Sequence, residues 1–334
     1  MLFLWVAIAI LVLALGGIVY QALATARDNR RFQPPGQMVN IGGRRLHLVI
    51  MGDAKGRPTV LLEQGMGSFS SNWYWVQTEL ASDTRVIAYD RAGLGWSDPP
   101  PGVHDAYDSA ADLGQGLAAA GIAGPYIVAG HSYGGLVARA FTDLYPNEVV
   151  GLVLVDASHP DQWAHFPASR NGWTIALGNR VLNWLAWPGI VRLFDLESKA
   201  RRGLPERPAA EMKAILAQPR SWSTSSRSLA IWNEKTRPRI NQARPLDGLP
   251  LSVLSVTEQS GYTAETLTAL QAELPTLSTN SAHYTIEGAT HESLVSERQH
   301  ALVVVGAIRQ VLEAAQTGRP LSEIPLSASE VPSP

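Results

Sequence analysis

The sequence contains no cysteine, which excludes disulfide bonds, thiolate metal sites and a cysteine nucleophile. It is also poor in charge, because charged residues make up 17% of the chain while hydrophobic residues make up 46%. The net charge of -2 leaves no basic surplus for phosphates, so we expect no nucleic-acid partner. Scattered histidines, no H-E-x-x-H motif and no complete glycine fingerprint predict neither a metal nor a cofactor.

A long run without charged residues lies at the N-terminus, where residues 1–21 read MLFLWVAIAILVLALGGIVYQ. A helix of about twenty such residues crosses the roughly 30 Å of bilayer hydrocarbon, so we predict a single-pass membrane anchor. The alternative is a signal peptide cleaved at Ala22-Leu23-Ala24, which would leave a secreted or periplasmic protein. The length of the run and the lack of a preceding Lys or Arg favour the anchor. Arg27, Arg30 and Arg31 follow the run, and the positive-inside rule would keep that flank cytoplasmic.

Short apolar runs alternate with helix-like stretches through most of the remaining chain. Most runs are apolar throughout, which is typical of strands covered on both faces of a parallel sheet. The expected strands are 45–51, 59–63, 85–89, 126–129, 151–155, 251–256 and 283–287. The expected helices are 73–80, 105–120, 135–145, 265–274 and 297–315. This alternation predicts an α/β fold with a doubly wound, mostly parallel sheet, which begins with an antiparallel hairpin turning at Gly42-Gly43.

One long interval, from His159 to about Arg244, carries no strand pattern but contains six of the ten tryptophans. We predict an inserted helical cap, whose tryptophans mostly pack it onto the main domain while a few form an apolar wall of a cleft. The expected organisation is an anchor (1–21), a linker (22–37), the first part of the core (38–158), the cap (159–244), the second part of the core (245–316) and a disordered tail (317–334).

The strongest chemical motif is Gly130-His131-Ser132-Tyr133-Gly134, which lies between an expected strand and an expected helix. A sharp strand-to-helix turn exposes its central serine, and the flanking glycines let neighbouring backbone pass without a clash. The N-terminus of the following helix favours negative charge that develops at the serine. Ser132 is therefore the predicted nucleophile.

A serine hydroxyl needs a base within hydrogen-bond reach. His291 is the predicted base because it follows the last expected strand in a Gly288-Ala289-Thr290 loop, which can carry it over the sheet. The adjacent His131 is expected to point away from the side chain of Ser132. For the oxyanion hole we predict the backbone N–H groups of Tyr133 and Met66, the latter from the glycine-rich loop after residues 59–63.

Together these motifs resemble the α/β-hydrolase fold family, specifically bacterial esterase-like serine hydrolases with a helical cap. The resemblance covers roughly residues 38–315 and rests on LEQGMG (62–67), YDRAGLGWSD (89–98), GHSYG (130–134), LVD (154–156) and GATH (288–291). In this family a His-Gly pair usually precedes the oxyanion donor. This chain has Gln64-Gly65 instead, a departure that leaves the donor backbone intact.

The resemblance leaves the acid of the catalytic triad open. Family members commonly place it after the strand that is here 251–256, where Glu258 is the acidic residue at the strand end. Some relatives instead use an acid at the end of the preceding strand, which is here Asp156. We favour Asp156, because a short strand-end aspartate is held rigidly enough to fix the imidazole tautomer. Glu258 is the alternative acid, and Asp161 is a more distant one.

The resemblance implies a carboxylic ester hydrolase-like enzyme that cleaves a small, largely apolar substrate through an acyl-enzyme. Alternatives on the same fold are an amidase or iminopeptidase, a lactonase, a cofactor-free haloperoxidase-like enzyme and a carbon-carbon bond hydrolase. Dehalogenases and epoxide hydrolases of this fold carry an aspartate at the turn, so Ser132 argues against both. A non-catalytic receptor for a small ligand is the alternative from another class. The oligomeric state is not predicted.

Overall fold

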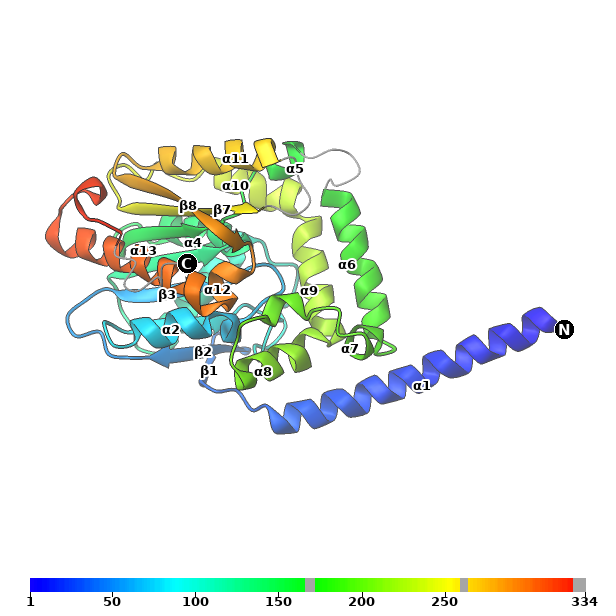
Figure 1. Ribbon diagram of the computed structural model, residues 1–334. Coiled ribbons are helices and arrows are strands. Elements are labelled where there is room, and N and C mark those ends of the chain that lie inside the picture. The colour runs from blue at the N-terminus through cyan, green and yellow to red at the C-terminus, as the bar shows by residue number, and fades with distance from the viewer. Residues whose placement is uncertain (166–171, 259–263, 327–334) are drawn as a thin grey trace.

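The computed structural model describes residues 1–165, 172–258 and 264–326. An eight-stranded sheet in the order β1-β2-β4-β3-β5-β6-β7-β8 forms its centre (Figure 1). The strands are β1 (Gln37–Asn40), β2 (Arg45–Met51), β3 (Thr59–Glu63), β4 (Val86–Asp90), β5 (Tyr126–His131), β6 (Val149–Val155), β7 (Leu251–Glu258) and β8 (Ser281–Thr290). β2 pairs antiparallel with β1 and β4, and the remaining neighbours pair parallel. The predicted mostly parallel sheet is confirmed, and Gly42 and Gly43 turn its first hairpin with positive φ.

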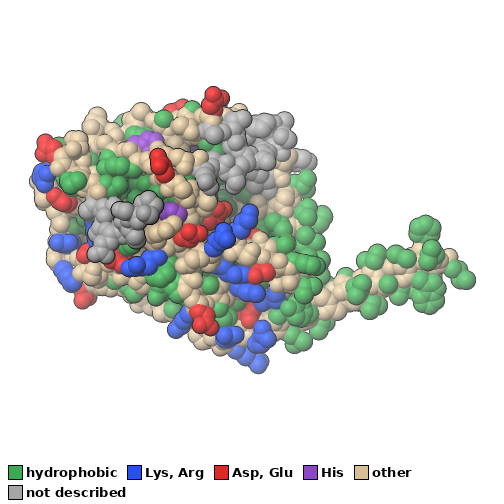
Figure 2. Space-filling view, viewed as in Figure 1, with side chains coloured by type: hydrophobic (Ala, Val, Ile, Leu, Met, Phe, Trp, Pro, Cys, Tyr) green, Lys and Arg blue, Asp and Glu red, His purple; other side chains and the backbone are tan. Residues whose placement is uncertain are grey.

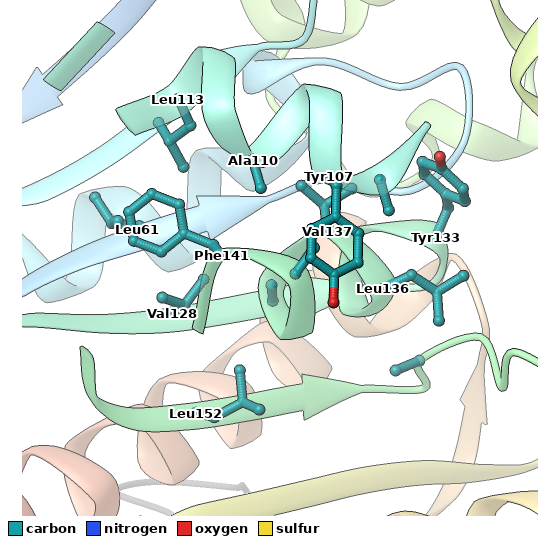
Figure 3. Packing of buried hydrophobic residues seen from close by; sticks show 14 of the residues in the cluster. Leu61, Tyr107, Ala110, Leu113, Val128, Tyr133, Leu136, Val137, Phe141 and Leu152 are labelled. Carbon is teal, nitrogen blue, oxygen red and sulfur yellow. The ribbon is translucent and has the colours of Figure 1, made fainter. Parts of the chain in front are cut away.

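Helices cover both faces of this sheet, as the continuously apolar strands predict. Leu61 of β3 belongs to the core under α3 and α4, whereas Val60 and Leu62 belong to the core under α2 and α13. Figure 3 shows Phe141 of α4 packed beside Leu61 and Val128 of the sheet. The helices of this main body are α2 (Tyr74–Leu80), α3 (Ala106–Ala119), α4 (Tyr133–Leu144), α11 (Ala264–Glu273), α12 (Ser293–Ser296) and α13 (Arg298–Thr317).

A helical insertion lies between β6 and β7, and we call it the cap. It contains α5 (Gln162–His165), α6 (Gly172–Ala186), α7 (Ile190–Leu193), α8 (Glu206–Leu216), α9 (Pro219–Ala230) and α10 (Arg237–Asn241). A π-helical turn, Trp232–Thr236, joins α9 to α10. The cap lies beyond the carboxyl end of β5, the end of the sheet to which the serine motif belongs, and α6 and α9 run alongside each other there (Figure 1).

The N-terminal helix α1 spans Leu2–Arg31 and extends away from the body (Figure 1). Its first part is apolar and exposed, and it is the one described helix long and apolar enough to cross a membrane. The linker expected over residues 22–37 is wrong for residues 22–31, which continue the helix. The physical reason is contact with the cap, where Gln21 donates to Ala217 O at 2.9 Å and the buried Asp28 pairs with Arg192.

The expected disordered tail is also wrong where the structure describes it. Residues 318–326 fold back onto the sheet, with Leu321 and Ile324 buried in the core under α13. Gln310 of α13 donates to Ile324 O at 2.6 Å and so fixes this segment. Residues 327–334 lie outside the described residues.

Candidate active site

Ser132 lies at the turn between β5 and α4, with φ of 55° and ψ of -126°. A non-glycine residue rarely adopts this conformation, so the surroundings must impose it. A Cβ on Gly134 would lie 2.3 Å from Glu63 O, and one on Gly130 would lie 2.4 Å from Gly134 O. Ser132 N donates to Val155 O at 3.1 Å, which ties the turn to β6. The backbone therefore holds the hydroxyl at the carboxyl edge of the sheet, at the start of α4.

His291 follows β8 directly, and its ring Nδ1 lies 2.5 Å from Oδ2 of Asp156. Asp156 ends β6 in the left-handed region, with φ of 40°, and its N–H donates to Leu254 O at 2.6 Å. Asp is among the few residues that tolerate this conformation. A carboxylate can only accept at Nδ1, so Nδ1 carries the proton and Nε2 is the acceptor.

Two opposing effects act on the pKa of His291. Its enclosure lowers the pKa, while the hydrogen bond and charge of Asp156 and the charge of Glu292 raise it. The electrostatic effects prevail, so the pKa of His291 is raised from its ordinary value. The imidazolium that forms when His291 accepts a proton is thereby stabilised.

The other two acids considered from the sequence lie elsewhere or lack a described side chain. The backbone of Glu258 pairs with Thr290 at the end of β8, next to His291, and its side chain lies outside the described residues. Asp161 bonds Arg237 and Asn241 in the cap. Asp156 is thus the acid that the structure brings to the imidazole.

The glycine-rich loop after β3 passes against the serine turn. A Cβ on Gly65 would lie 3.3 Å from Cβ of Ser132, so the backbone of this loop is in direct contact with the turn. In the part of the chain that the structure describes, the N–H groups of Met66 and Tyr133 have no hydrogen-bond acceptor. Both donors therefore remain available beside the hydroxyl of Ser132.

Arg91 fixes this loop from the core side. Its guanidinium donates to the carbonyls of Gln64 and Gly65, each at 2.5 Å, and pairs with Glu63 at 3.2 Å. Burial raises the pKa of Glu63 to about 7, against the charge of Arg91 and the hydrogen bonds from Tyr89 and Arg91. The side chain of Gln64 is buried, and its amide has no hydrogen-bond partner among the described residues.

His131 contacts the base in a way that the sequence does not predict. The ring is buried, and its Nε2 donates to the backbone carbonyl of His291 at 2.8 Å. The two imidazoles lie with centroids 4.5 Å apart. Burial and the neighbouring His291 hold the pKa of His131 well below its ordinary value, so the ring stays neutral. Its position beside Ser132 was the available signal, but only the fold brings β8 close enough for this contact.

Ser132, His291, Asp156, Met66 and Tyr133 all line one cavity of about 390 Å³. Apolar side chains from the cap and from β7 and α11 form part of the cavity wall: Trp163, Leu229, Trp232, Val256 and Leu267. Polar side chains such as Gln162, Asn179 and Gln271 line it as well. A larger cavity of about 510 Å³, lined by cap and α4 residues, contains none of these five predicted residues.

The cap tryptophans divide into two groups. Trp163 and Trp232 face the catalytic cavity, pack edge to face at 5.5 Å and bring Trp232 within 5.6 Å of the Tyr133 ring. Trp184 and Trp187 are exposed on the outside of the cap. The Trp173 side chain lies outside the described residues.

The chain is similar to known proteins in sequence and in fold. A family described as "Alpha/beta hydrolase family" matches residues 60–305. The probable transporter efuK of Hormonema carpetanum is 36% identical over 136 residues, which are 39% of this chain and 20% of that protein. The chain spans about a fifth of the length of the first curated relatives it matches.

Two solved structures share the fold. One is a thermophilic esterase from Thermogutta terrifontis, with a TM-score of 0.62 and 24% identity, over 84% of this chain and 99% of that one. The other is a membrane phospholipase A described as a bacterial virulence factor, with a TM-score of 0.62 and 19% identity, over 95% of this chain and 97% of that one. At these identities the likeness shows the fold alone.

Proposed function

Because the chain belongs to the alpha/beta hydrolase family, we propose that it is a membrane-tethered serine hydrolase that cleaves carboxylic esters through an acyl-enzyme. The observation that carries the proposal is the shared cavity, where His291 is bonded to Asp156 beside the strained turn at Ser132. A base oriented by a buried acid is what a serine hydroxyl needs to act as a nucleophile at neutral pH.

The chemistry follows from the position of each group. The Ser132 hydroxyl attacks the ester carbonyl while Nε2 of His291 takes its proton, and Asp156 stabilises the imidazolium. The N–H groups of Met66 and Tyr133 bind the negative oxygen of the tetrahedral intermediate. His291 then returns the proton to the leaving alcohol, and water attacks the acyl-enzyme by the same route. His131 is a positioning residue, because it holds the backbone carbonyl of His291.

The cavity wall favours an apolar acyl or aryl group. Trp163, Trp232, Leu229 and Leu267 offer apolar surface opposite the catalytic residues. No charged side chain other than Asp156, His291 and Glu292 is among the described residues that line this cavity. A substrate with a negatively charged acyl group would therefore leave that charge without a cationic partner from these residues.

Membrane attachment is supported by the contacts of α1. Cleavage after Ala24 would cut the helix between Gln21 and Asp28, both of which are buried against the cap. We propose that α1 is retained as an anchor. Recovery from the membrane fraction with the intact mass is expected, and a soluble product beginning after Ala24 would overturn it.

The activity is tested with a fluorophosphonate probe, which forms a covalent bond to an activated serine. Wild-type protein is expected to be labelled, and Ser132→Ala is expected to abolish labelling. The matched control is Ser158→Ala, because Ser158 lines the same cavity and should leave labelling unchanged. An unlabelled wild type would favour a non-catalytic receptor. Labelling combined with cleavage of anilides or lactones, but not of esters, would favour the amidase or lactonase alternative.

A further inference from the structure

Exposed hydrophobic side chains gather on one edge of the cap. Trp184, Leu193 and Phe194 are 70%, 69% and 67% exposed, and they lie within a stretch from Leu177 to Leu196 that holds further exposed apolar residues. Among the described residues outside α1 and this stretch, only Tyr74 and Leu144 are large, hydrophobic and exposed. We call the exposed apolar side chains of residues 177–196 the cap edge. Figure 2 shows hydrophobic side chains along the border of the body that faces α1.

The spacing within α6 shows that the cap edge is a continuous face. Leu177, Val181 and Trp184 are exposed at intervals of four and three residues, so they share one side of the helix. Trp187, Leu193, Phe194 and Leu196 add exposed apolar side chains beyond the end of α6. A soluble protein rarely leaves a contiguous apolar face of this kind uncovered.

Contacts between α1 and the cap fix where a bilayer would lie. A Cβ on Gly17 would lie 2.5 Å from Pro188 O, and a Cβ on Gly189 would lie 2.9 Å from the Tyr20 ring. The end of the apolar run of α1 is therefore packed against the turn between α6 and α7. Residues 2–20 of a helix span about 30 Å, the thickness of bilayer hydrocarbon. The hydrocarbon boundary of an anchored chain would thus pass beside this turn.

The direction of α6 suits this boundary. In Figure 1, α6 runs crosswise to α1, so a bilayer crossed by α1 would have α6 along its surface. Tryptophans are favoured at that depth, and exposed basic residues such as Arg27, Arg180 and Lys199 suit anionic headgroups there.

A second cavity lies next to the catalytic cavity. It has a volume of about 100 Å³ and shares Met66 and Asn179 with the catalytic cavity. Glu197, which directly follows Leu196 of the cap edge, also lines it. An acyl chain leaving the bilayer at the cap edge would therefore reach the loop that carries one oxyanion donor.

We propose that the cap edge docks into the interfacial layer of the bilayer that α1 spans, and that the ester substrate is a lipid-like, long-chain acyl ester drawn from that bilayer. The second half of this inference rests on the proposed function. A lipid surface, rather than a protein, is the occupant because the cap edge is continuous with the apolar surface of α1.

The absence of cysteine makes docking directly measurable. Full-length Trp184→Cys and Phe194→Cys variants are spin-labelled and reconstituted in vesicles of phosphatidylcholine and phosphatidylglycerol. The control is Leu144→Cys, an exposed apolar position at the end of α4, outside the cap. Labels at 184 and 194 should be accessible to oxygen and protected from a water-soluble nickel complex, and the label at 144 should show the reverse. Nickel access equal to that of the control overturns the proposal. Spin coupling between two copies would also overturn it, in favour of a dimer interface.

The source of the substrate is tested with a Trp184→Gln/Phe194→Gln double variant. Its rate on a water-soluble short-chain ester should stay within about twofold of wild type, while its rate on a long-chain ester embedded in vesicles should fall about tenfold or more, because only interfacial docking has been lost. Equal effects on both esters, or none on the embedded ester, overturn the inference. A wild type that cleaves neither ester would refute the proposed function alone, since the spin labels still report on docking.

Discussion

The serine turn and the junction between α1 and the cap are both tight, but they are built in different ways. At the turn, backbone meets backbone, and Gly134 leaves no room for a Cβ against Glu63 O. At the junction, Gly17 also approaches backbone closely, but buried side-chain pairs add to the contact, with Arg192 bridging Gln21 and Asp28. A constraint made of backbone is set by local residue type, whereas one made of side chains depends on partners far along the chain.

This difference predicts how each region responds to substitution. The turn should tolerate almost no added atom but should be indifferent to charge. The junction should tolerate added volume at its margins but not the loss of one partner of a buried pair. The catalytic groups combine both conditions, because Asp156 is a buried charge held in a strained backbone conformation.

The largest effect is expected for Asp156→Asn, which keeps the shape of the side chain. An amide can donate to Nδ1 and so favours the wrong imidazole tautomer, and kcat should fall by about 10⁴-fold. Steady-state hydrolysis of a soluble ester measures this. Asp161→Asn is the matched control and should change kcat less than threefold. If Glu258→Gln lowers kcat by as much as Asp156→Asn or more, the assignment of Asp156 as the acid is wrong.

Next in size is Gly134→Ala, which adds one methyl group where the backbone of β3 blocks it. The strand must shift, and the free energy of unfolding should fall by about 3 kcal/mol, as for other severe overpacking. Chemical denaturation in detergent measures the loss. Gly102→Ala is the control, since nothing lies within 4 Å of its added Cβ. Equal stability of the two variants would show that the turn is not held by close backbone packing.

A smaller and more local effect is expected for Arg192→Met at the junction. The substitution leaves Asp28 buried without its cation, which should cost the α1 contact about 2 kcal/mol. Amide hydrogen exchange of residues 21–31 should then accelerate about thirtyfold, while exchange in β5 stays unchanged. Adding Asp28→Asn should restore part of the protection. Arg45→Met removes a mostly exposed pair with Asp98 and should have little effect.

The same distinction explains which features the sequence predicts. The turn at Ser132 can be predicted from the sequence because its glycines lie close together in the chain, and each avoids a clash with nearby backbone. The strands of the sheet are readable because burial on both faces makes them uniformly apolar. The helical continuation over residues 22–31 is not readable, because its partners Arg192 and Ala217 lie more than 160 residues away.

Two further features cannot be predicted from the sequence for the same reason. Residues 318–326 look like a tail by composition, yet Leu321 and Ile324 are buried in the core, and Gln310 donates a hydrogen bond to Ile324 O. His131 looks like a neighbour of the nucleophile, whereas its contact with His291 depends on the fold bringing the residue after β8 to the end of β5. Composition cannot supply such contacts, since they require the finished sheet.

The smallest predicted effect concerns Glu292, whose charge acts on a residue of the catalytic site and on a residue of the cap. Its charge raises the pKa of His291 and, after burial, that of the cap residue Glu197, which reaches about 7. A protonated His291 cannot act as base, so kcat/KM should fall on the acid side through the raised pKa of His291. Glu292→Gln should move this acid-side fall in kcat/KM to lower pH without changing the maximum value of kcat/KM, because only the charge is removed. The pH profile of kcat/KM on a soluble ester measures this. Ser293→Ala is a neighbouring control that leaves the charge in place. The contribution of His291 to folding stability depends on pH in the opposite direction. The folded state holds the His291 proton more tightly, so the added stability is present below the ordinary pKa and is lost as pH rises through the raised value. If the acid-side fall in kcat/KM moves to higher pH in Glu292→Gln, the Glu292 charge does not raise the pKa of His291 and the prediction is wrong.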